Sequence, residues 1–289
     1  MRVADTRVFD LADGRELAWI EYGLGDGAPV VAFHGSPGTR YHFAGLTDVA
    51  ARKGARLIAP DRPGYGHSTF DPARSYESWA RDVEQLADHL GIEGFAVIGH
   101  SSGGPNAAAC ARFLGDRLVG CAIVSGVAPP EAHVAKHAML LMNRITQRLA
   151  PVAPRLLGIA ATAGLRQGQR DPEKALAWMR RILPPRDAAL IERPELRAAL
   201  RADMERVAST AGRAAVQDVE LELRPWGFRL RDIAIPVHVW HGDLDRNVVV
   251  ESGIYQANEI PHATLHELPD EGHWLVYDHF DEILDCVAA

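Results

Sequence analysis

The sequence predicts an α/β fold, in which helices flank a mostly parallel β-sheet, and three observations support this prediction. Short apolar segments, such as residues 30–33 and 95–98, alternate with longer segments whose apolar residues recur at helical spacing. A serine between glycines, at residues 99–103, directly follows one of the short apolar segments. A chain of 289 residues with 47% hydrophobic residues can also bury the substantial core that such a fold requires.

The first half of the chain is expected to open with an antiparallel hairpin, whose turn is at residues 12–14, and to continue with alternating strands and helices. The predicted strands are residues 7–11, 16–22, 30–33, 56–59, 95–98 and 118–124. The predicted helices are residues 43–53, 76–90 and 106–112. Because parallel strands need crossover connections, this alternation predicts the parallel part of the sheet.

The alternation stops at the proline pair 129–130. Beyond it, residues 131–224 have helical composition and proline breaks but no strand pattern. We interpret residues 128–224 as a helical cap inserted after the sixth strand, and residues 1–127 and 225–289 as the core.

Apolar side chains are more numerous in this segment than exposed helices would need. They are Leu140, Leu141, Met142, Leu156, Leu157, Trp178, Met179, Ile182 and Leu183. We expect some of them to cover a pocket on the core; the alternative is that they only pack a small core within the cap. The main core then resumes with strands at residues 237–240 and 264–268 and a final helix over about 277–287.

Composition excludes several classes of partner. The 38 acidic and 31 basic residues are intermingled and form no basic run or face, so we expect no nucleic-acid partner. The first residues lack the apolar stretch of a secretory signal, and no apolar run is long enough to span a membrane, which predicts a cytoplasmic location without membrane contact.

The cysteines predict neither a disulfide nor a metal site. Cys110, Cys121 and Cys286 are odd in number, far apart in the sequence and in apolar contexts. Cys110 lies inside an alanine-rich helix, which favours packing over a reactive thiol.

Ser101 is the candidate nucleophile. Gly99 and Gly103 allow a sharp turn from strand to helix, and such a turn exposes a serine hydroxyl at the carboxyl end of a sheet. The alternative is a glycine-rich helix start that Ser101 merely caps.

A serine hydroxyl needs a histidine base and a carboxylate that orients this base. The loop after strand 237–240 offers Asp243 and Asp245, and the loop after the last strand offers His273, which follows a glycine. His273 is preferred among the histidines because His89, His266 and His279 fall within predicted helices or strands.

Four motifs together resemble the α/β-hydrolase superfamily over essentially the whole chain. They lie at residues 34–38, 61–68, 99–103, and 242–245 together with 272–273. The resemblance implies the α/β-hydrolase fold, a mostly parallel eight-stranded sheet flanked by helices with an inserted helical cap. It also favours Asp245 as the acid. Asp243 is the alternative acid; otherwise it braces the turn through backbone hydrogen bonds.

The resemblance assigns supporting roles to other motif residues. His34 and His100 are expected to support the walls of the site. The glycines of residues 61–68 are expected to shape a turn beneath it, with no chemistry for Tyr65 or His67.

Two backbone N–H groups are expected to stabilise the oxyanion that forms during acyl transfer. Ser102 follows the nucleophile at a helix N-terminus, where the helix dipole favours negative charge. The resemblance implies Ser36 as the second donor; the alternative is that residues 35–38 form an ordinary Pro-Gly turn.

These residues predict a serine hydrolase of the carboxylesterase type, acting on a small-molecule ester without cofactor or metal. Serine at position 101 argues against relatives that use an aspartate nucleophile. The acyl length and the oligomeric state are left open, as are thioester, lactone and carbon–carbon bond hydrolysis.

A proline iminopeptidase-like amidase is the nearest alternative, but Ser36 replaces that group's usual glycine, and no tryptophan flanks Ser101. Acidic cap residues could bind a substrate amine in such an enzyme; we interpret them instead as solvated helix charges. They are Glu205, Glu220 and Glu222. An alternative of another class is a non-catalytic protein that uses a hydrolase pocket for ligand binding.

Overall fold

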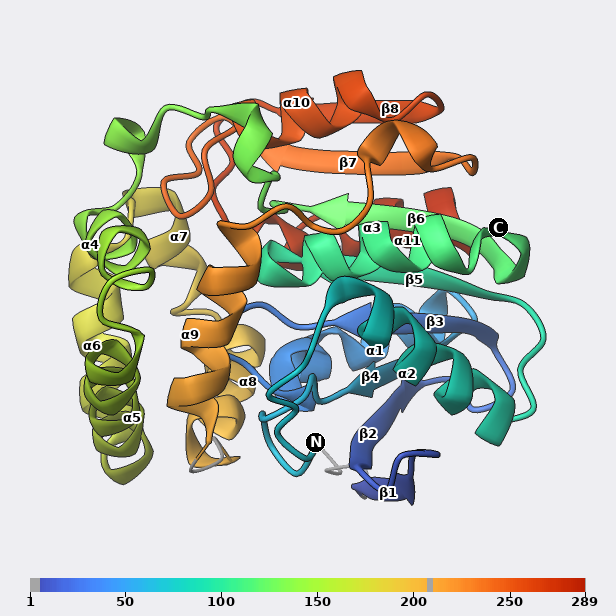
Figure 1. The fold of residues 1–289 in the computed structure, drawn as a ribbon, viewed down its shortest axis with the longest axis horizontal. Coiled ribbons are helices and arrows are strands. Elements are labelled where there is room, and N and C mark those ends of the chain that lie inside the picture. The colour runs from blue at the N-terminus through green and yellow to red at the C-terminus, as the bar shows by residue number, and fades with distance from the viewer. Residues whose placement is uncertain (1–5, 207–209, 289) are drawn as a thin grey trace.

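The computed structural model describes residues 6–206 and 210–288. Within them, eight strands form one sheet in the order β1-β2-β4-β3-β5-β6-β7-β8 (Figure 1). The strands are β1 (Arg7–Asp10), β2 (Glu16–Gly23), β3 (Ala28–Phe33), β4 (Ala55–Pro60), β5 (Phe95–His100), β6 (Leu118–Val124), β7 (Val237–Gly242) and β8 (Ala263–Leu268). The pairs β1–β2 and β2–β4 are antiparallel and the other neighbouring pairs are parallel, so the predicted sheet is confirmed.

Helices cover both faces of this sheet (Figure 1). On one face lie α2 (Tyr76–His89), α3 (Gly104–Phe113) and α10 (Glu251–Glu259); on the other lie α1 (Thr47–Arg52) and α11 (Phe280–Val287). The residues of β5 are buried along its whole length, which explains why its sequence is apolar rather than alternating.

Two helix predictions differ from the structure, and one helix of the core was not predicted. The helix expected over residues 43–53 is a 3-10 helix, Arg40–Leu46, followed by α1. The final helix begins at Phe280, because Leu275–Tyr277 form a separate 3-10 turn. Helix α10 was not predicted, because it buries small and polar residues rather than an apolar stripe; the Gln256 amide, for example, donates to two backbone carbonyls after β6.

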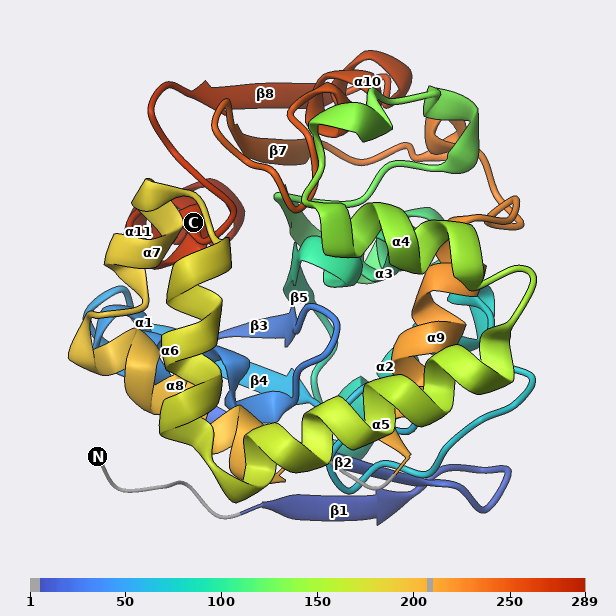
Figure 2. The same cartoon turned by 90° about the vertical axis from the view of Figure 1, so that its left-hand side faces the viewer.

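Between β6 and β7, a series of helices stands at the carboxyl ends of the parallel strands (Figure 1). They are α4 (Leu141–Leu149), α5 (Pro154–Arg170), α6 (Pro172–Ile182), α7 (Pro185–Leu190), α8 (Pro194–Arg206) and α9 (Ala211–Glu222). Several begin at a proline, whose missing N–H and fixed φ suit the first turn of a helix. Figure 2 shows α4, α5, α9 and the pair α6 and α8 arranged around the ends of β3 and β5. We call residues 128–224 the cap segment; its boundaries as a domain stay a prediction.

Helices of the cap segment pack around a small hydrophobic cluster of their own. Trp274, which lies outside the cap segment in the loop after β8, also belongs to this cluster. Met179 and Leu183 pack against this cluster. Other apolar side chains of the segment are instead exposed, namely Leu141, Met142, Leu156, Trp178 and Ile182. Among the described helices, none is both long and apolar enough to cross a membrane. The three cysteines are free, with Cys110 and Cys121 buried in the main core.

Candidate active site

Ser101 lies at a sharp turn between β5 and α3. Its φ of +57° is in the left-handed region that non-glycine residues rarely adopt. A Cβ on Gly99 would lie 2.2 Å from the Gly103 carbonyl oxygen, and a Cβ on Gly103 would lie 2.3 Å from the carbonyl oxygen of Phe33. Only glycine therefore fits on either side of the turn, and the half-buried Ser101 is presented at the carboxyl end of the sheet.

The structure joins Asp245 to His273. Nδ1 of His273 donates to Oδ2 of Asp245 at 2.7 Å, and both residues are buried. The other carboxylate oxygen accepts from the backbone N–H groups of Asn247 at 2.8 Å and Val248 at 3.0 Å. Asp243, the alternative acid, is exposed.

Electrostatics favour an ionised Asp245 beside His273. Burial alone would raise the pKa of Asp245, but the charge of His273 and hydrogen bonds from His241 and His273 outweigh burial and hold this pKa well below its ordinary value. Burial would lower the pKa of His273, but the Asp245 carboxylate reverses this effect, so the pKa of His273 is raised. The pair thus suits a base that becomes an imidazolium during a reaction.

His100 connects the His273 loop to the turn at Ser101. Nε2 of His100 donates to the backbone carbonyl of His273 at 2.8 Å, and the two ring centroids are 4.8 Å apart. Nδ1 of His100 then accepts from Nε2 of His42 at 3.0 Å. Burial lowers the pKa of His100 well below its usual value, which keeps the ring neutral for these bonds. Among the described residues, the Ser101 hydroxyl itself forms no hydrogen bond to His273; such bonds often tighten only when substrate binds.

The loop after β3 lies against Ser101. A Cβ on Gly35 would be 3.1 Å from Cβ of Ser101, so the backbone next to Ser36 is close to the nucleophile. His34 holds this loop: its Nδ1 donates to the Gly35 carbonyl at 2.7 Å, and its Nε2 accepts from the Arg62 N–H at 3.0 Å. Within the described part of the chain, no protein acceptor takes the Ser36 N–H. Ser102 lies in the 3-10 turn that leads into α3, where the first N–H groups of a helix lack partners.

Tyr65 braces Ser36 from the motif at residues 61–68. Its hydroxyl is 2.8 Å from the Ser36 hydroxyl and donates to Asp218 of α9 at 2.5 Å. Asp218 also accepts from Arg62 and Arg74. This buried network ties the oxyanion candidate Ser36 to the cap segment, a contact that the sequence analysis did not predict.

Asp187 of α7 reaches the His273 loop from the cap segment. Its Oδ1 accepts from the backbone N–H of Trp274 at 3.1 Å, and a Cβ on Gly272 would lie 2.4 Å from this same oxygen. Asp187 is fully buried. Asp187 therefore contacts the backbone on both sides of His273. In the sequence, it is recognisable only as an acidic residue in the first turn of a helix.

The carboxyl group of Glu222 is not solvated as the sequence predicts. We interpreted it as a solvated helix charge, but its Oε1 is buried and has no hydrogen-bond partner among the described residues. Burial, with the nearby charge of Asp218, raises the pKa of Glu222 to about 7, and Ser102 lies beside its carboxyl group. Glu205 and Glu220 carry ion pairs with neighbouring arginines instead. The sequence around Glu222, at the end of α9, does not indicate that its side chain lies near the site. Its position depends on the path by which the chain returns from the cap segment to the core.

Known proteins resemble this chain in fold and, over part of its length, in sequence. A family model described as alpha/beta hydrolase fold matches residues 28–280. The uncharacterized hydrolase YcgS of Bacillus subtilis is 34% identical over 100 residues, which are 34% of this chain and 35% of that protein. The bifunctional esterase/perhydrolase DCH of Acinetobacter calcoaceticus is 32% identical over 121 residues, or 40% of this chain and 43% of that protein. The chain thus aligns with less than half the length of these curated relatives.

Solved structures align with nearly the whole chain, and one of them serves as an example. It is the crystal structure of a hydrolase from Pseudomonas aeruginosa, which covers 99% of both chains with a TM-score of 0.69 at 20% identity. A likeness at this identity shows the fold alone.

Proposed function

The chain belongs to the α/β-hydrolase fold family, and we propose that it is a serine hydrolase that cleaves carboxylic esters of small molecules through an acyl-enzyme on Ser101. The observation that carries the proposal is the buried Asp245–His273 pair, held against the turn that presents Ser101.

In the acylation step, Oγ of Ser101 attacks the ester carbonyl carbon while Nε2 of His273 takes the hydroxyl proton. The backbone N–H groups of Ser36 and Ser102 donate to the oxyanion of the tetrahedral intermediate. The carbon–oxygen bond to the alcohol then breaks, and His273 returns the proton to the leaving alcohol. Asp245 keeps Nδ1 of His273 protonated and stabilises the imidazolium throughout.

In the deacylation step, His273 takes a proton from water, whose oxygen attacks the acyl carbon. Collapse of the second tetrahedral intermediate breaks the bond to Oγ of Ser101 and releases the carboxylic acid. The proton returns to Ser101, so that atoms and charge balance without a cofactor.

One observation supports an ester as the substrate: a relative that shares sequence with this chain is named as an esterase/perhydrolase.

The test is hydrolysis of short p-nitrophenyl esters combined with active-site labelling. We expect a fluorophosphonate probe to label Ser101, as located by peptide mass spectrometry, and Ser101→Ala to lose both labelling and about 10⁵-fold or more of the turnover. Ser102→Ala, which keeps the backbone N–H, is the matched control and should retain labelling. A wild-type protein that binds esters but is neither labelled nor active would instead be a ligand-binding protein.

Glu222, whose Oε1 is buried without a hydrogen-bond partner among the described residues, favours one second candidate, an amidase that binds a substrate amine near Ser102. An ammonium group would pair with this carboxylate and offset the free-energy cost of its burial. The test compares prolyl-β-naphthylamide with a p-nitrophenyl ester: a larger kcat/KM for the amide, lost in Glu222→Gln, would favour the amidase. A larger kcat/KM for the ester, unchanged in Glu222→Gln, would favour the esterase.

A further inference from the structure

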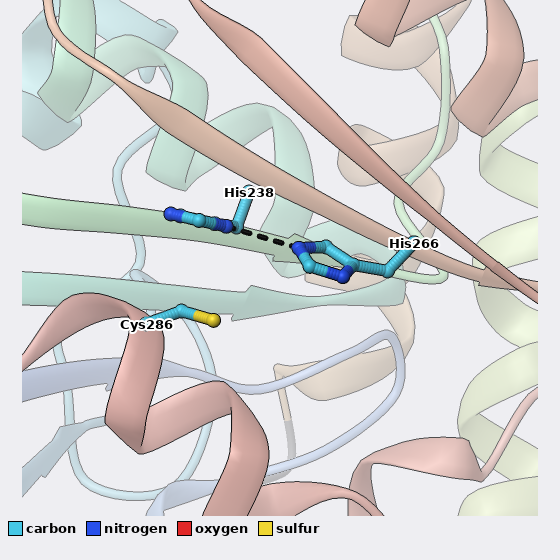
Figure 3. A group of neighbouring side chains, drawn as sticks. All are labelled: His238, His266 and Cys286. Carbon is cyan, nitrogen blue, oxygen red and sulfur yellow. Dashed lines mark hydrogen bonds between the residues drawn. The ribbon is translucent and has the colours of Figure 1, made fainter.

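A second group of chemically active side chains lies between β7, β8 and α11. It consists of His238, His266 and Cys286, and each residue is half-buried (Figure 3). One ligand atom of each, an imidazole nitrogen or the thiol sulfur, lies within 4.8 Å of the other two. We propose that this group, called here the His2Cys cluster, binds a divalent ion of the zinc class.

The sheet register explains why the two histidines meet. His238 pairs with Thr264, and Trp240 pairs with His266, so the histidines are diagonal neighbours on adjacent parallel strands. Side chains two positions apart on a strand share a face, so both point to the face that α11 covers, where Cys286 lies. The three ligands come from β7, β8 and α11, so no local sequence motif predicts the site.

The distances are close to those of a tetrahedral site. Zinc takes imidazole nitrogen at about 2.0–2.1 Å and thiolate at about 2.3 Å, so ligand atoms around it are roughly 3.3–3.6 Å apart. Nδ1 of His238 and Nε2 of His266 are already 3.0 Å apart and share a hydrogen bond. Insertion of an ion replaces this bond: the ring that donates it carries its proton on its other nitrogen instead, and the Cys286 thiol releases its proton to solvent as the sulfur coordinates. The ion also separates the nitrogens slightly and requires the Cys286 sulfur to approach by up to about 1 Å, which a side-chain rotation can supply.

The surroundings favour ligation by the two histidines. Burial lowers the pKa of both rings, which keeps the nitrogens neutral and able to coordinate. Burial, with the charges of Asp285 and Glu282, raises the pKa of the Cys286 thiol, so the ion has to displace the thiol proton when it binds. The Trp240 ring stacks on His266 at a centroid distance of 3.9 Å and holds its orientation. The cluster is half-buried beside the edge strand β8, so an ion can enter and a water molecule can fill the fourth position.

Imidazole with thiolate is the donor set of zinc and neighbouring late transition metals rather than of magnesium or calcium. The bound ion would join β7 and β8, whose following loops carry Asp245 and His273, to α11. Its expected effect is therefore on stability, and the inference does not depend on the proposed ester hydrolysis.

The experiment is a Co²⁺ titration of tag-free protein, followed by competition with Zn²⁺. We expect one equivalent of Co²⁺ to produce the visible bands of a tetrahedral ion and a near-ultraviolet thiolate-to-cobalt charge-transfer band. Cys286→Ser should lose the charge-transfer band, and His266→Ala should weaken Zn²⁺ affinity by about 100-fold or more. His262→Ala, at an exposed histidine just before β8, is the matched control and should leave both unchanged.

A thermal readout complements the spectra. Zn²⁺ should raise the Tm of the wild type and of His262→Ala, because a ligand that binds only the folded state stabilises it, but not the Tm of His238→Gln or His266→Ala. Circular dichroism of the metal-free variants verifies their folding, and either histidine variant suffices if the other fails to fold. Absence of the charge-transfer band in the wild type, or equal Zn²⁺ affinity in the wild type and a folded histidine variant, would overturn the proposal.

Discussion

Asp245→Asn should stop the reaction by reversing the tautomer of His273. One oxygen of Asp245 accepts from two backbone N–H groups, at 2.8 and 3.0 Å, so the asparagine carbonyl oxygen must remain there. The asparagine NH₂ group then faces Nδ1 of His273, at the 2.7 Å position of the lost oxygen. An NH₂ group can only donate, so Nδ1 must accept and the proton moves to Nε2. A protonated Nε2 cannot take the proton of Ser101.

The expected loss in kcat is about 10⁴-fold, which corresponds to about 5.5 kcal/mol of transition-state stabilisation. The assay is steady-state hydrolysis of a p-nitrophenyl ester, with circular dichroism to verify the fold. Asp243→Asn is the matched control, since Asp243 is exposed two positions away and should retain activity within about twofold. Greater damage from Asp243→Asn, or more than a tenth of wild-type activity in Asp245→Asn, would refute the reasoning.

Three further predictions follow from the same contacts. Since the Asp245 carboxylate raises the pKa of His273 and only the neutral ring accepts a proton, kcat/KM should rise with pH and reach half its maximum above pH 6.5; a profile that stays flat down to pH 5 contradicts this role. Gly103→Ala should lower the free energy of unfolding by about 3 kcal/mol in urea denaturation, because its Cβ would lie 2.3 Å from a carbonyl oxygen, whereas Gly25→Ala, with open space around it, should change it by less than about 0.5 kcal/mol. Asp187→Ala should remove the acceptor of the Trp274 N–H and lower kcat by about 10- to 100-fold through displacement of His273, with rescue by Asp187→Asn; equal kcat in the alanine variant and the wild type would show that this contact does not position His273.

Most of the core could be predicted because its signals are local. The apolar runs at residues 30–33 and 95–98, in β3 and β5, are buried between helices on both faces, so hydrophobicity alone identifies them. Helix α10 lacks this signal, because its buried residues are Ser252, Gly253 and Gln256 rather than an apolar stripe.

In the candidate site, too, some residues have a local sequence signal and others do not. Ser101 could be identified from its glycine neighbours, since the turn needs them within two residues on either side. The choice between Asp243 and Asp245 could only be favoured by resemblance, because both occupy one loop; burial and the bond to His273 distinguish them in the structure.

The sequence by itself determined the eight strands, most of the core helices and the identity of the candidate nucleophile, because hydrophobic spacing and glycine turns act over a few residues. Only the tertiary structure decided which cap carboxylates reach the site, how Tyr65 braces Ser36 and where the His2Cys cluster forms. These side chains are far apart along the chain and meet only because sheet register and helix packing bring them together. Their positions follow from the whole fold, and no short segment of sequence contains that information.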